Sequence, residues 1–402
     1  MTNIDPQKIE EVLTRGVDEV IDKESLKKKL LSGKVLRIKL GIDPTSPNIH
    51  IGRSIPLLKL RDFQNLGHKV VLIIGDFTGI IGDTSDKDSE RPMLDVKTIK
   101  ENMKNYAKQA GKILDMRKCE VKYNSKWLKK LNYYDFSELA ELFSVHEFNA
   151  RENIAKRLNA GKRVSLREVI YPLMQGYDSV AVQADVELGG TDQRFNLLAG
   201  RDIQKHYKQE PQDIITNPLI EGTDGRKMSS SWGNTINLLD SGDEMFGKTM
   251  SIPDELIVKY FTLVTRVSLE EIAQIKKLGN PRDQKALLAK EIVRMYHGDK
   301  VAGLAAENFI KIFRRHEAPD EIPVFETSKN PYPVLDLLVD AKLAESKNDA
   351  RRVIEGGGVT VKLSSSSSSS SYKVESWKQE ITIEDGMVFQ FGKRKFVKVK
   401  LK

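Results

Sequence analysis

The stretch "KVLRIKLGIDPTSPNIHIGRSIPLLKLRDFQNLGHKVVLIIG", residues 34–75, decides the fold. It begins with a strand-like segment that ends near Gly41, continues as a helical pattern that stops at Gly67, and closes on the apolar run "KVVLIIG". A continuous apolar run with β-branched residues is typical of a strand buried on both faces. A strand, a helix and a second strand at this spacing form a βαβ unit, which predicts a parallel sheet.

The segments around this unit extend it into a larger α/β domain. Asp5 and Pro6 predict the start of a helix, as its N-cap and first residue, and we expect that helix to run to about Leu31. The patterns of residues 95–165 are mostly helical, and "ADVELGG" and "DIITNPLI" predict further strands. Residues 1–242 are therefore predicted to form a doubly wound, Rossmann-like parallel-sheet domain with a helical insertion at about 95–165.

The remainder of the chain predicts two further domains. Residues 243–326 carry helical patterns, so we expect an α-helical domain there. After the linker "SKNPYP", residues 332–402 combine two short helices with strands, which indicates a small α+β domain. Within it, eight serines at 364–371 predict a disordered loop between two strands, and we assign no chemistry to them.

Composition narrows the class of protein. The 402 residues have a net charge of +8 and a pI near 9.1, which suits a polyanionic partner but is also common on ordinary surfaces. The single cysteine, Cys119, excludes a disulfide framework and a cysteine-based zinc site, and no metal site is predicted. The start is acidic and amphipathic, unlike a secretory signal, and the most apolar stretch is interrupted by Asp76. We therefore expect a cytoplasmic protein that does not span a membrane.

The loop after the first strand of the βαβ unit has the features of a nucleotide site. In "GIDPTSPNIHIGR" a helix is expected to start near Gly52, and the amides at its N-terminus favour a phosphate. A lone histidine such as His50 is usually structural, but here Asp43, Thr45 and Arg53 accompany it on one loop. We therefore interpret the loop as part of a nucleotide site.

A second polar group lies on the predicted helix "IYPLMQGYD". Tyr171, Gln175 and Asp178 share one face of that helix, since they are four and three residues apart. Such a stripe usually faces water, but it can also line a polar pocket. The sequence "LGGTDQ" follows closely, and Gly189 and Gly190 permit a ligand to approach the backbone, so we favour the pocket.

The stretch "GRKMSSSWGN", residues 225–234, has two interpretations. Its serines and glycines are typical of a flexible surface linker. A linker, however, does not need Met228 and Trp232, and a lysine such as Lys227 on a mobile loop can move to a leaving phosphate. Taken alone, the stretch does not decide between a linker and a catalytic loop.

Together, these motifs resemble those of the class I aminoacyl-tRNA synthetases. "HIGR" is similar to the His-Ile-Gly-His motif of that class, and "KMSSS" to its Lys-Met-Ser-Lys-Ser motif. "YxxxQxxD" followed by "GGTDQ", together with "GDFTGIIGDTSDKDSER", resembles the bacterial tyrosyl-tRNA synthetases. "SKNDARRVIEGGGVTV" looks like their C-terminal S4 RNA-binding domain. The resemblance covers nearly the whole chain and implies an ATP-dependent tyrosine–tRNA ligase, in which residues 243–326 bind the anticodon region of tRNA.

The resemblance also implies roles for individual residues. Tyrosine and ATP would form tyrosyl-adenylate and pyrophosphate, and the tyrosyl group would then pass to tRNA. The enzyme would catalyse the reaction mainly by positioning the substrates and by stabilising negative charge on the phosphates. The implied catalytic residues are Thr45, His50, Lys227, Lys87 and Arg91. The implied ATP-binding residues are Asp43, Gly52, Arg53, Gly190, Asp192, Gln193, Lys227, Met228 and Ser230. The implied tyrosine-binding residues are Asp83, Tyr171, Gln175 and Asp178, of which Asp178 would accept the phenol hydroxyl. Mg²⁺ would accompany ATP, held mostly by phosphates.

Three positions depart from the family pattern. Arg53 stands where the motif has its second histidine, and Ser230 stands where it has its second lysine. Either another cation replaces the missing loop lysine, or Lys227 carries more of the charge than it does in relatives. The candidate cations are Lys87, Arg91, Arg53 and Arg226. Lys39 stands where many tyrosyl enzymes have a tyrosine that shares the contact with the phenol, and a lysine cannot repeat that contact.

The end of the chain carries a basic pattern of its own. In "RKFVKVKLK" lysines alternate with apolar residues, so that one face of a strand would be basic while the other packs. Such lysines can simply protect an edge strand from aggregation. We favour the alternative that Lys398 and Lys400 form an RNA phosphate footprint together with Arg351 and Arg352.

The expected partners are therefore tyrosine, ATP and tRNA. The resemblance further implies a homodimer with the helical insertion at its interface. Two alternatives stay open: the tryptophan enzyme of the same fold, and a relative that binds RNA without catalysis. The second alternative draws on the departures at Arg53 and Ser230.

Overall fold

The computed structural model describes residues 2–84, 92–314, 322–363, 371–392 and 395–402. The chain divides into two compact units, one of residues 1–240 with 251–288 and one of residues 241–250 with 289–402. The helical segment expected at 243–326 is thus shared between the two units. Within the described ranges, no helix has both the length and the apolar character needed to cross a membrane.

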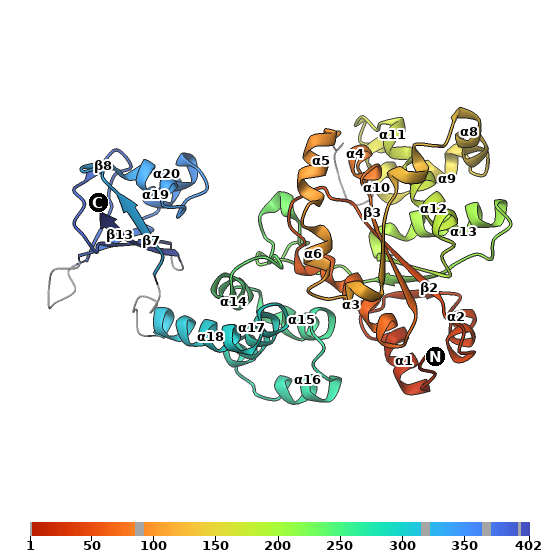
Figure 1. The fold of residues 1–402 in the computed structure, drawn as a ribbon, viewed down its shortest axis with the longest axis horizontal. Helices are drawn as coiled ribbons and strands as arrows, with labels where there is room; N and C mark the ends of the chain where they lie inside the picture. The colour runs from red at the N-terminus through yellow and green to blue at the C-terminus, as the bar shows by residue number, and fades with distance from the viewer. Residues whose placement is uncertain (1, 85–91, 315–321, 364–370, 393–394) are drawn as a thin grey trace. The chain divides into compact units, whose positions relative to one another are not determined.

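A six-stranded sheet forms the centre of the first unit (Figure 1). Its strands, in spatial order, are β1 (Glu19–Ile21), β6 (Asp213–Asn217), β5 (Val186–Gly190), β2 (Arg37–Ile42), β3 (Lys69–Ile74) and β4 (Cys119–Tyr123). Neighbouring strands run parallel, except that β1 is antiparallel to β6. From β2 the order continues to β3 and β4 on one side and to β5 and β6 on the other, so β2 and β5 form the switch point of a doubly wound sheet. The predicted Rossmann-like fold is confirmed.

Helices surround this sheet and connect its strands. Those before β4 are α1 (Pro6–Thr14), α2 (Lys23–Leu31), α3 (Ile51–Asn65), α4 (Thr78–Ile81), α5 (Val96–Met103) and α6 (Tyr106–Ala110), with a 3-10 turn at Met116–Lys118. Those between β4 and β5 are α7 (Ser125–Leu128), α8 (Tyr133–Glu141), α9 (Val145–Asn149), α10 (Glu152–Asn159), α11 (Leu166–Val169) and α12 (Tyr171–Val182). Beyond β5 come 3-10 turns at Thr191–Gln193, Ser230–Trp232 and Asp254–Leu256, with α13 (Arg194–His206), α15 (Ile257–Val264) and α16 (Leu269–Lys276).

The deciding βαβ unit forms as predicted, because its strands are buried and its helix is capped. Residues 70–74 of β3 are buried on both faces between β2 and β4. Helix α3 begins directly after His50, which serves as its N-cap. The C-terminal ends of β2 and β5 therefore lie beside the N-terminus of α3, where a parallel sheet of this kind binds its ligands.

One expectation about the first unit was wrong in extent, and another, that residues 95–165 are mostly helical, omitted a strand. The first helix ends at Thr14, because Gly16 adopts a positive φ of 63° and the chain then forms β1 against β6 before α2 begins. Residues 95–165 are not helices alone, because Cys119–Tyr123 form the edge strand β4. Their half-buried, charged sequence lacks the apolar run that identifies the inner strands.

The second unit combines helices with a small antiparallel-rich sheet. Its helices are α14 (Gly242–Met250), the second half of α17 (Pro281–His297), α18 (Asp299–Arg314), α19 (Val334–Asp340) and α20 (Lys347–Glu355). Its larger sheet has the order β10 (Ser371–Lys373), β9 (Val359–Lys362), β12 (Val388–Phe391), β13 (Lys395–Leu401) and β7 (Val324–Thr327). A smaller pair joins β8 (Tyr332–Pro333) to β11 (Glu380–Ile381). The serine run joins the hairpin strands β9 and β10, and apart from Ser371 it lies outside the described residues.

Candidate active site

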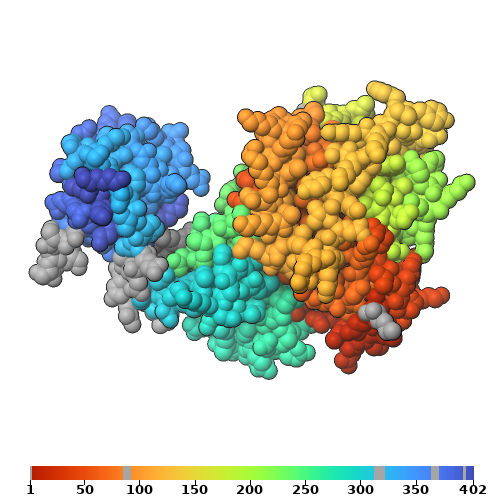
Figure 2. All heavy atoms as spheres, viewed as in Figure 1, coloured from red at the N-terminus to blue at the C-terminus, as the bar shows by residue number. Residues whose placement is uncertain are grey.

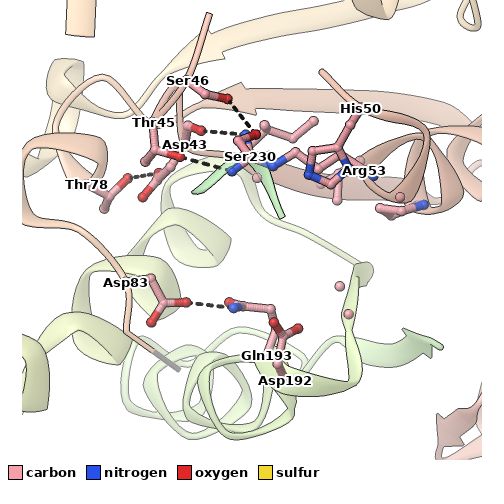
Figure 3. Close-up of a pocket in the computed structure, with 18 of the residues that line it drawn as sticks. Asp43, Thr45, Ser46, His50, Arg53, Thr78, Asp83, Asp192, Gln193 and Ser230 are labelled. Carbon is pink, nitrogen blue, oxygen red and sulfur yellow. Dashed lines mark hydrogen bonds between the residues drawn. The ribbon is translucent and has the colours of Figure 1, made fainter. Parts of the chain in front are cut away.

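A cavity of about 830 Å³ lies at the C-terminal ends of β2 and β5 in the first unit. Pockets of this size suit small-molecule substrates. Every predicted ATP- or tyrosine-site residue that the structure describes lies on its wall. These residues are Asp43, Thr45, His50, Gly52, Arg53, Asp83, Tyr171, Gln175, Asp178, Gly190, Asp192, Gln193, Lys227, Met228 and Ser230. Figure 3 labels several of them. The two remaining predictions, Lys87 and Arg91, lie outside the described residues.

His50 is fixed by the start of helix α3. Its Nδ1 accepts a hydrogen bond of 3.3 Å from the backbone N–H of Arg53, so the neutral ring carries its proton on Nε2. Gly52 leaves room for this arrangement, since a Cβ there would lie 3.0 Å from His50 Nδ1. The loop therefore presents a histidine and the N-terminus of a 15-residue helix to the same cavity.

Arg53 braces the loop that precedes this helix. Its guanidinium donates to Thr45 Oγ1 at 3.0 Å and to the hydroxyl of Tyr106 at 3.1 Å. The Tyr106 hydroxyl in turn donates to the carbonyl of Ser46 at 2.6 Å. In this structure the departure from the second motif histidine thus serves to order Thr45. Sequence reasoning missed Tyr106, which reaches the loop from a helix about 60 residues away.

Asp43 receives two donors from different parts of the fold. Thr78 Oγ1 donates to its Oδ1 at 2.7 Å, and the hydroxyl of Tyr171 donates to its Oδ2 at 2.8 Å. Burial, followed by the charge of Asp43, raises the pKa of Tyr171 well above its ordinary value, so this hydroxyl stays a donor. Gly75 makes the arrangement possible, because a Cβ there would lie 2.0 Å from Asp43 Oδ1.

Asp178 is a buried carboxyl group at another part of the wall and is only 4% exposed. Trp127 Nε1 donates to its Oδ1 at 2.7 Å, and Asn124 Nδ2 donates to its Oδ2 at 3.2 Å. Burial raises the pKa of Asp178 to about 7, against the lowering effects of Lys39 and of these two donors. Sequence reasoning missed Trp127 and Asn124, because they follow β4, the strand that it did not identify.

Lys39 does not line the cavity, although a tyrosine of many related enzymes takes its place in the sequence. Its side chain is 0% exposed and forms an ion pair of 2.8 Å with Glu187 on the neighbouring strand β5. The lysine therefore contributes no direct contact to a ligand in this cavity.

Amide and carboxylate groups of three segments meet on the wall between these sites. Gln193 Nε2 donates to Asp83 Oδ2 at 2.6 Å (Figure 3). Asn196 Nδ2 bridges the side-chain carbonyls of Gln175 and Gln193, at 3.0 and 3.1 Å. The pattern leaves carbonyl and carboxylate oxygens along the wall, and these are the groups that bind an ammonium ion.

Residues 227–231 of the stretch 225–234 line the cavity, which favours the interpretation as a loop of the site over that as a surface linker. Met228 is buried and its N–H donates to the carbonyl of Ile220 at 2.9 Å. Asn234 accepts from the backbone N–H of Ser229 at 2.9 Å and donates to the carbonyl of Lys227 at 3.1 Å. Lys227 forms an ion pair of 3.1 Å with Asp192.

Ser230, which replaces the second motif lysine, approaches the loop after β2. Its hydroxyl donates to Ser46 Oγ at 3.4 Å, which joins the two loops on one side of the cavity. The nearby Arg226 is paired with Asp224 and lies 4.9 Å above the ring of Trp232, and it is not on the cavity wall. Arg226 therefore does not replace the missing cation in this arrangement.

The predicted RNA-binding residues lie in the second unit. Lys398 and Lys400 are exposed on β13, while Val397 and Val399 between and beside them are buried. The alternation is as predicted, but β13 lies between β12 and β7 and so is not an edge strand. Arg351 and Arg352 lie on α20 in exposed ion pairs with Glu355 and Asp349, contacts that contribute little stability.

The segment between β4 and α12 exposes large apolar side chains. Tyr133 is 92% exposed, and Tyr134, Val145 and Leu166 are also largely exposed. Figure 2 shows this part of the chain, in gold, on the surface of the first unit.

Comparisons with known proteins show the family of the chain. The family model of the class I tRNA synthetases (W and Y) matches residues 31–314, and the model of the tyrosine–tRNA ligase SYY-like C-terminal domain matches residues 315–399. The tyrosine–tRNA ligase of Thermotoga maritima is 45% identical over 400 residues, 98% of each chain. That of Carboxydothermus hydrogenoformans is 46% identical over 407 residues, 97% of each chain.

Solved structures show the same fold. The C-terminally truncated mitochondrial tyrosyl-tRNA synthetase of Aspergillus nidulans has a TM-score of 0.63 at 21% identity, covering 77% of this chain and 94% of its own. The tyrosyl-tRNA synthetase of Archaeoglobus fulgidus, complexed with L-tyrosine, has a TM-score of 0.61 at 22% identity, covering 74% of this chain and 99% of its own.

Proposed function

The chain belongs to the tyrosine–tRNA ligase family of class I synthetases, and we propose that the cavity of its first unit carries out both steps of that reaction. In the first step the tyrosine carboxylate attacks the α-phosphate of ATP, and pyrophosphate leaves. In the second step a hydroxyl of the terminal adenosine of tRNA takes the tyrosyl group, and AMP leaves. The substrates are therefore tyrosine, ATP and tRNA.

The buried carboxyl group of Asp178 is the observation that carries the choice of amino acid. Asn124 and Trp127 already donate to it, and the phenol hydroxyl of tyrosine would supply a further donor. Phenylalanine lacks that donor, so the buried carboxyl group of Asp178 would lose one hydrogen bond. Leaving a buried acceptor without a donor costs about 1–3 kcal/mol, and more if the acceptor is charged. Gln175, Asp83 and Tyr171 would receive the ammonium group at the other end of the amino acid.

The loop after β2 and the start of α3 suit the phosphates of ATP. Thr45 and His50 would contact the γ-phosphate region, with Arg53 holding Thr45 in place. The amides at the N-terminus of α3 favour the same negative charge. Asp43 and Gln193 would lie near the reacting carboxylate and the α-phosphate.

The nucleoside end of ATP would lie toward β5 and the 225–234 loop. Gly52, Gly190 and Asp192 would contact the ribose, and Met228 would contact the adenine. Lys227 would stabilise the departing pyrophosphate, together with Lys87 and Arg91 from the 85–91 segment. Ser230 supplies a hydroxyl where relatives supply a second lysine, so Lys227 would carry more of the charge.

Mg²⁺ would arrive with ATP and be bound mainly by its phosphates. Among the residues that the structure describes, histidine, cysteine and carboxylate side chains form no cluster of three or more that could hold a metal ion. Bound to the phosphates, Mg²⁺ would neutralise part of the charge that develops on them.

The remaining parts of the chain would serve tRNA and self-association. We assign residues 243–326 to the anticodon region, and residues 332–402 to RNA binding of the S4 kind, with Arg351, Arg352, Lys398 and Lys400 on phosphates. A homodimer would cover the exposed Tyr133, Tyr134, Val145 and Leu166, and the enzyme would act in the cytoplasm.

The decisive experiment is tyrosine-dependent exchange of pyrophosphate into ATP, with Mg²⁺ present. Exchange with tyrosine and not with tryptophan supports the proposal, whereas preference for tryptophan would assign the chain to the related enzyme. Tight binding of tRNA without exchange or aminoacylation would instead identify an RNA-binding relative that has lost catalysis.

A pair of variants tests the loop. We expect Lys227→Ala to slow adenylate formation about 100-fold, the order of magnitude for losing one transition-state contact, with the dissociation constant of tyrosine within about threefold. Arg226→Ala is the matched control, since its side chain points to Asp224 and Trp232, and it should leave the rate within about threefold. If Arg226→Ala slowed the reaction as much as Lys227→Ala, the assignment of the loop lysine would be wrong.

A further inference from the structure

We propose that the buried Lys39–Glu187 ion pair fixes the orientation of the Gln175 side-chain amide, so that its carbonyl oxygen faces the ammonium group of the amino acid. The proposal rests on the function above and deepens it, since it assigns positioning residues that do not touch the substrate. Neither Lys39 nor Glu187 lies on the cavity wall, whereas Gln175 does.

The pair occupies the switch point of the sheet. Lys39 on β2 and Glu187 on β5 are register neighbours on adjacent parallel strands, and both are almost fully buried. Besides Glu187 Oε1 at 2.8 Å, the Lys39 ammonium donates to the backbone carbonyl of Gln175 at 2.9 Å and to Ser179 Oγ at 2.8 Å. Its three protons therefore have three partners, and two of them belong to helix α12, which carries the amino-acid site.

Glu187 receives several donors that suit an ionised carboxylate. Its Oε1 accepts from Gln175 Nε2 at 3.2 Å as well as from Lys39. Its Oε2 accepts from Ser179 Oγ at 3.1 Å and from Gln212 Nε2. Removing Lys39 would leave a buried carboxylate without its counter-ion, which is costly in free energy.

An ionised Glu187 determines which way the neighbouring amide points. A carboxylate can only accept, so the NH₂ end of Gln175 must face it and the carbonyl end must face away. That carbonyl accepts from Asn196 Nδ2, which also donates to the carbonyl of Gln193. The NH₂ of Gln193 is left to donate to Asp83. Each amide in the series thus has one orientation, set by Lys39 and Glu187 at one end and by Asp83 at the other.

This order has a consequence for the amino acid. Gln175 and Asp83 both lie on the cavity wall, and the carbonyl of the one and the carboxylate of the other can accept from a cation. A neutral Glu187 could donate a proton to Gln175, which would allow the amide to turn its NH₂ toward the cavity. The ammonium group would then lose an acceptor and face a donor in its place.

The test compares two tyrosine analogues, one that keeps the ammonium group and one that lacks it. Tyramine has the ammonium and lacks the carboxylate, whereas 3-(4-hydroxyphenyl)propionate has the carboxylate and lacks the ammonium. Dissociation constants are measured by calorimetry for the parent, for Glu187→Gln and for the neutral double variant Lys39→Met/Glu187→Gln. We expect the constant for tyramine to rise about tenfold or more in both variants, as for one hydrogen bond to a charged group. We expect the constant for the propionate to stay within about threefold.

Two controls separate orientation from general damage. The double variant Lys29→Met/Asp213→Asn removes another ion pair of the first unit, between α2 and β6 and away from the cavity wall. It should leave the dissociation constants of both analogues unchanged. Lys39→Arg keeps the positive charge and should keep the ratio of the two constants within about threefold of the parent. It also provides the test if the neutral variants fail to fold.

The outcomes are distinct from those that test the function. Equal loss of both analogues in the Lys39 and Glu187 variants, or no loss of tyramine, would overturn the proposal, as would a large change of the ratio in Lys39→Arg. Absence of tyrosine-dependent exchange in the parent would overturn the proposed function itself. Exchange in the parent combined with unselective loss in the variants would overturn only the role of the ion pair.

Discussion

Replacing Asp178 by asparagine should remove a pH dependence from the stability of the first unit. Burial raises the pKa of Asp178 from 3.8 to about 7, although Lys39, Trp127 and Asn124 act in the other direction. The folded protein thus binds a proton more tightly at this position than the unfolded chain does. Between pH 4 and 7 the contribution of Asp178 to the stability of the parent falls as pH rises, because ionising the buried group costs free energy that an exposed carboxyl group does not require.

The size of the effect follows from the shift. The two pKa values differ by about three units, and each unit corresponds to about 1.36 kcal/mol, so full ionisation costs about 4 kcal/mol of unfolding free energy. Between pH 4.5 and 8 we expect the parent to lose about 3 kcal/mol relative to Asp178→Asn. Any constant offset, such as a poorer hydrogen bond to Asn124 in the variant, does not depend on pH and cancels in this comparison.

The assay is urea unfolding of parent and variant side by side. The chain has three tryptophans, so Trp232 and Trp377 are first changed to phenylalanine, and Trp127 fluorescence then reports on the surroundings of Asp178 alone. A stability difference that stays constant from pH 4.5 to 8 would refute the reasoning. A difference that changes in the opposite direction would mean that Lys39 and the two donors outweigh burial.

Three further predictions concern the cavity and the surface. Gly75→Ala should lower the unfolding free energy by about 1–3 kcal/mol, because its Cβ would lie 2.0 Å from Asp43 Oδ1, whereas Gly41→Ala, whose Cβ meets no atom within 4 Å, should have little effect in the same thermal melt. Asn234→Ala should raise the KM for ATP several-fold in the exchange assay, because it releases hydrogen bonds within the 225–234 loop, and an unchanged KM would contradict that role. Tyr134→Asp should shift the proposed dimer toward monomer in analytical ultracentrifugation, since it would place a charge in an apolar contact, and an undisturbed dimer would locate the interface elsewhere.

The parts of the fold that the sequence predicts well are those with strong local signals. The apolar run of β3 and the capped start of α3 depend on neighbouring residues, and both form as expected. The edge strand β4 does not have such a signal, because its half-buried side chains mix charge with apolar character. The short strand β1 is likewise stabilised by pairing with β6, almost 200 residues later.

The same distinction applies to the site. Residues within short motifs, such as His50, Asp178 and Lys227, all reach the cavity wall. Their supporting groups could not be predicted, because Tyr106 and Trp127 come from other segments and make contact only after folding. The roles of the motif residues in binding and catalysis remain predictions that the experiments above test.

The ion pair between Lys227 and Asp192 affects when the lysine becomes available to ATP. In the proposed reaction Asp192 serves the ribose of ATP, while Lys227 serves its phosphates, yet in this structure the two side chains bind each other at 3.1 Å. The nucleotide must therefore separate them, and its ribose hydroxyl would release the lysine just as its phosphates arrive to receive it. Lys227 would then stay bound to Asp192 until ATP is present, so Asp192 would control when the lysine becomes available to the phosphates.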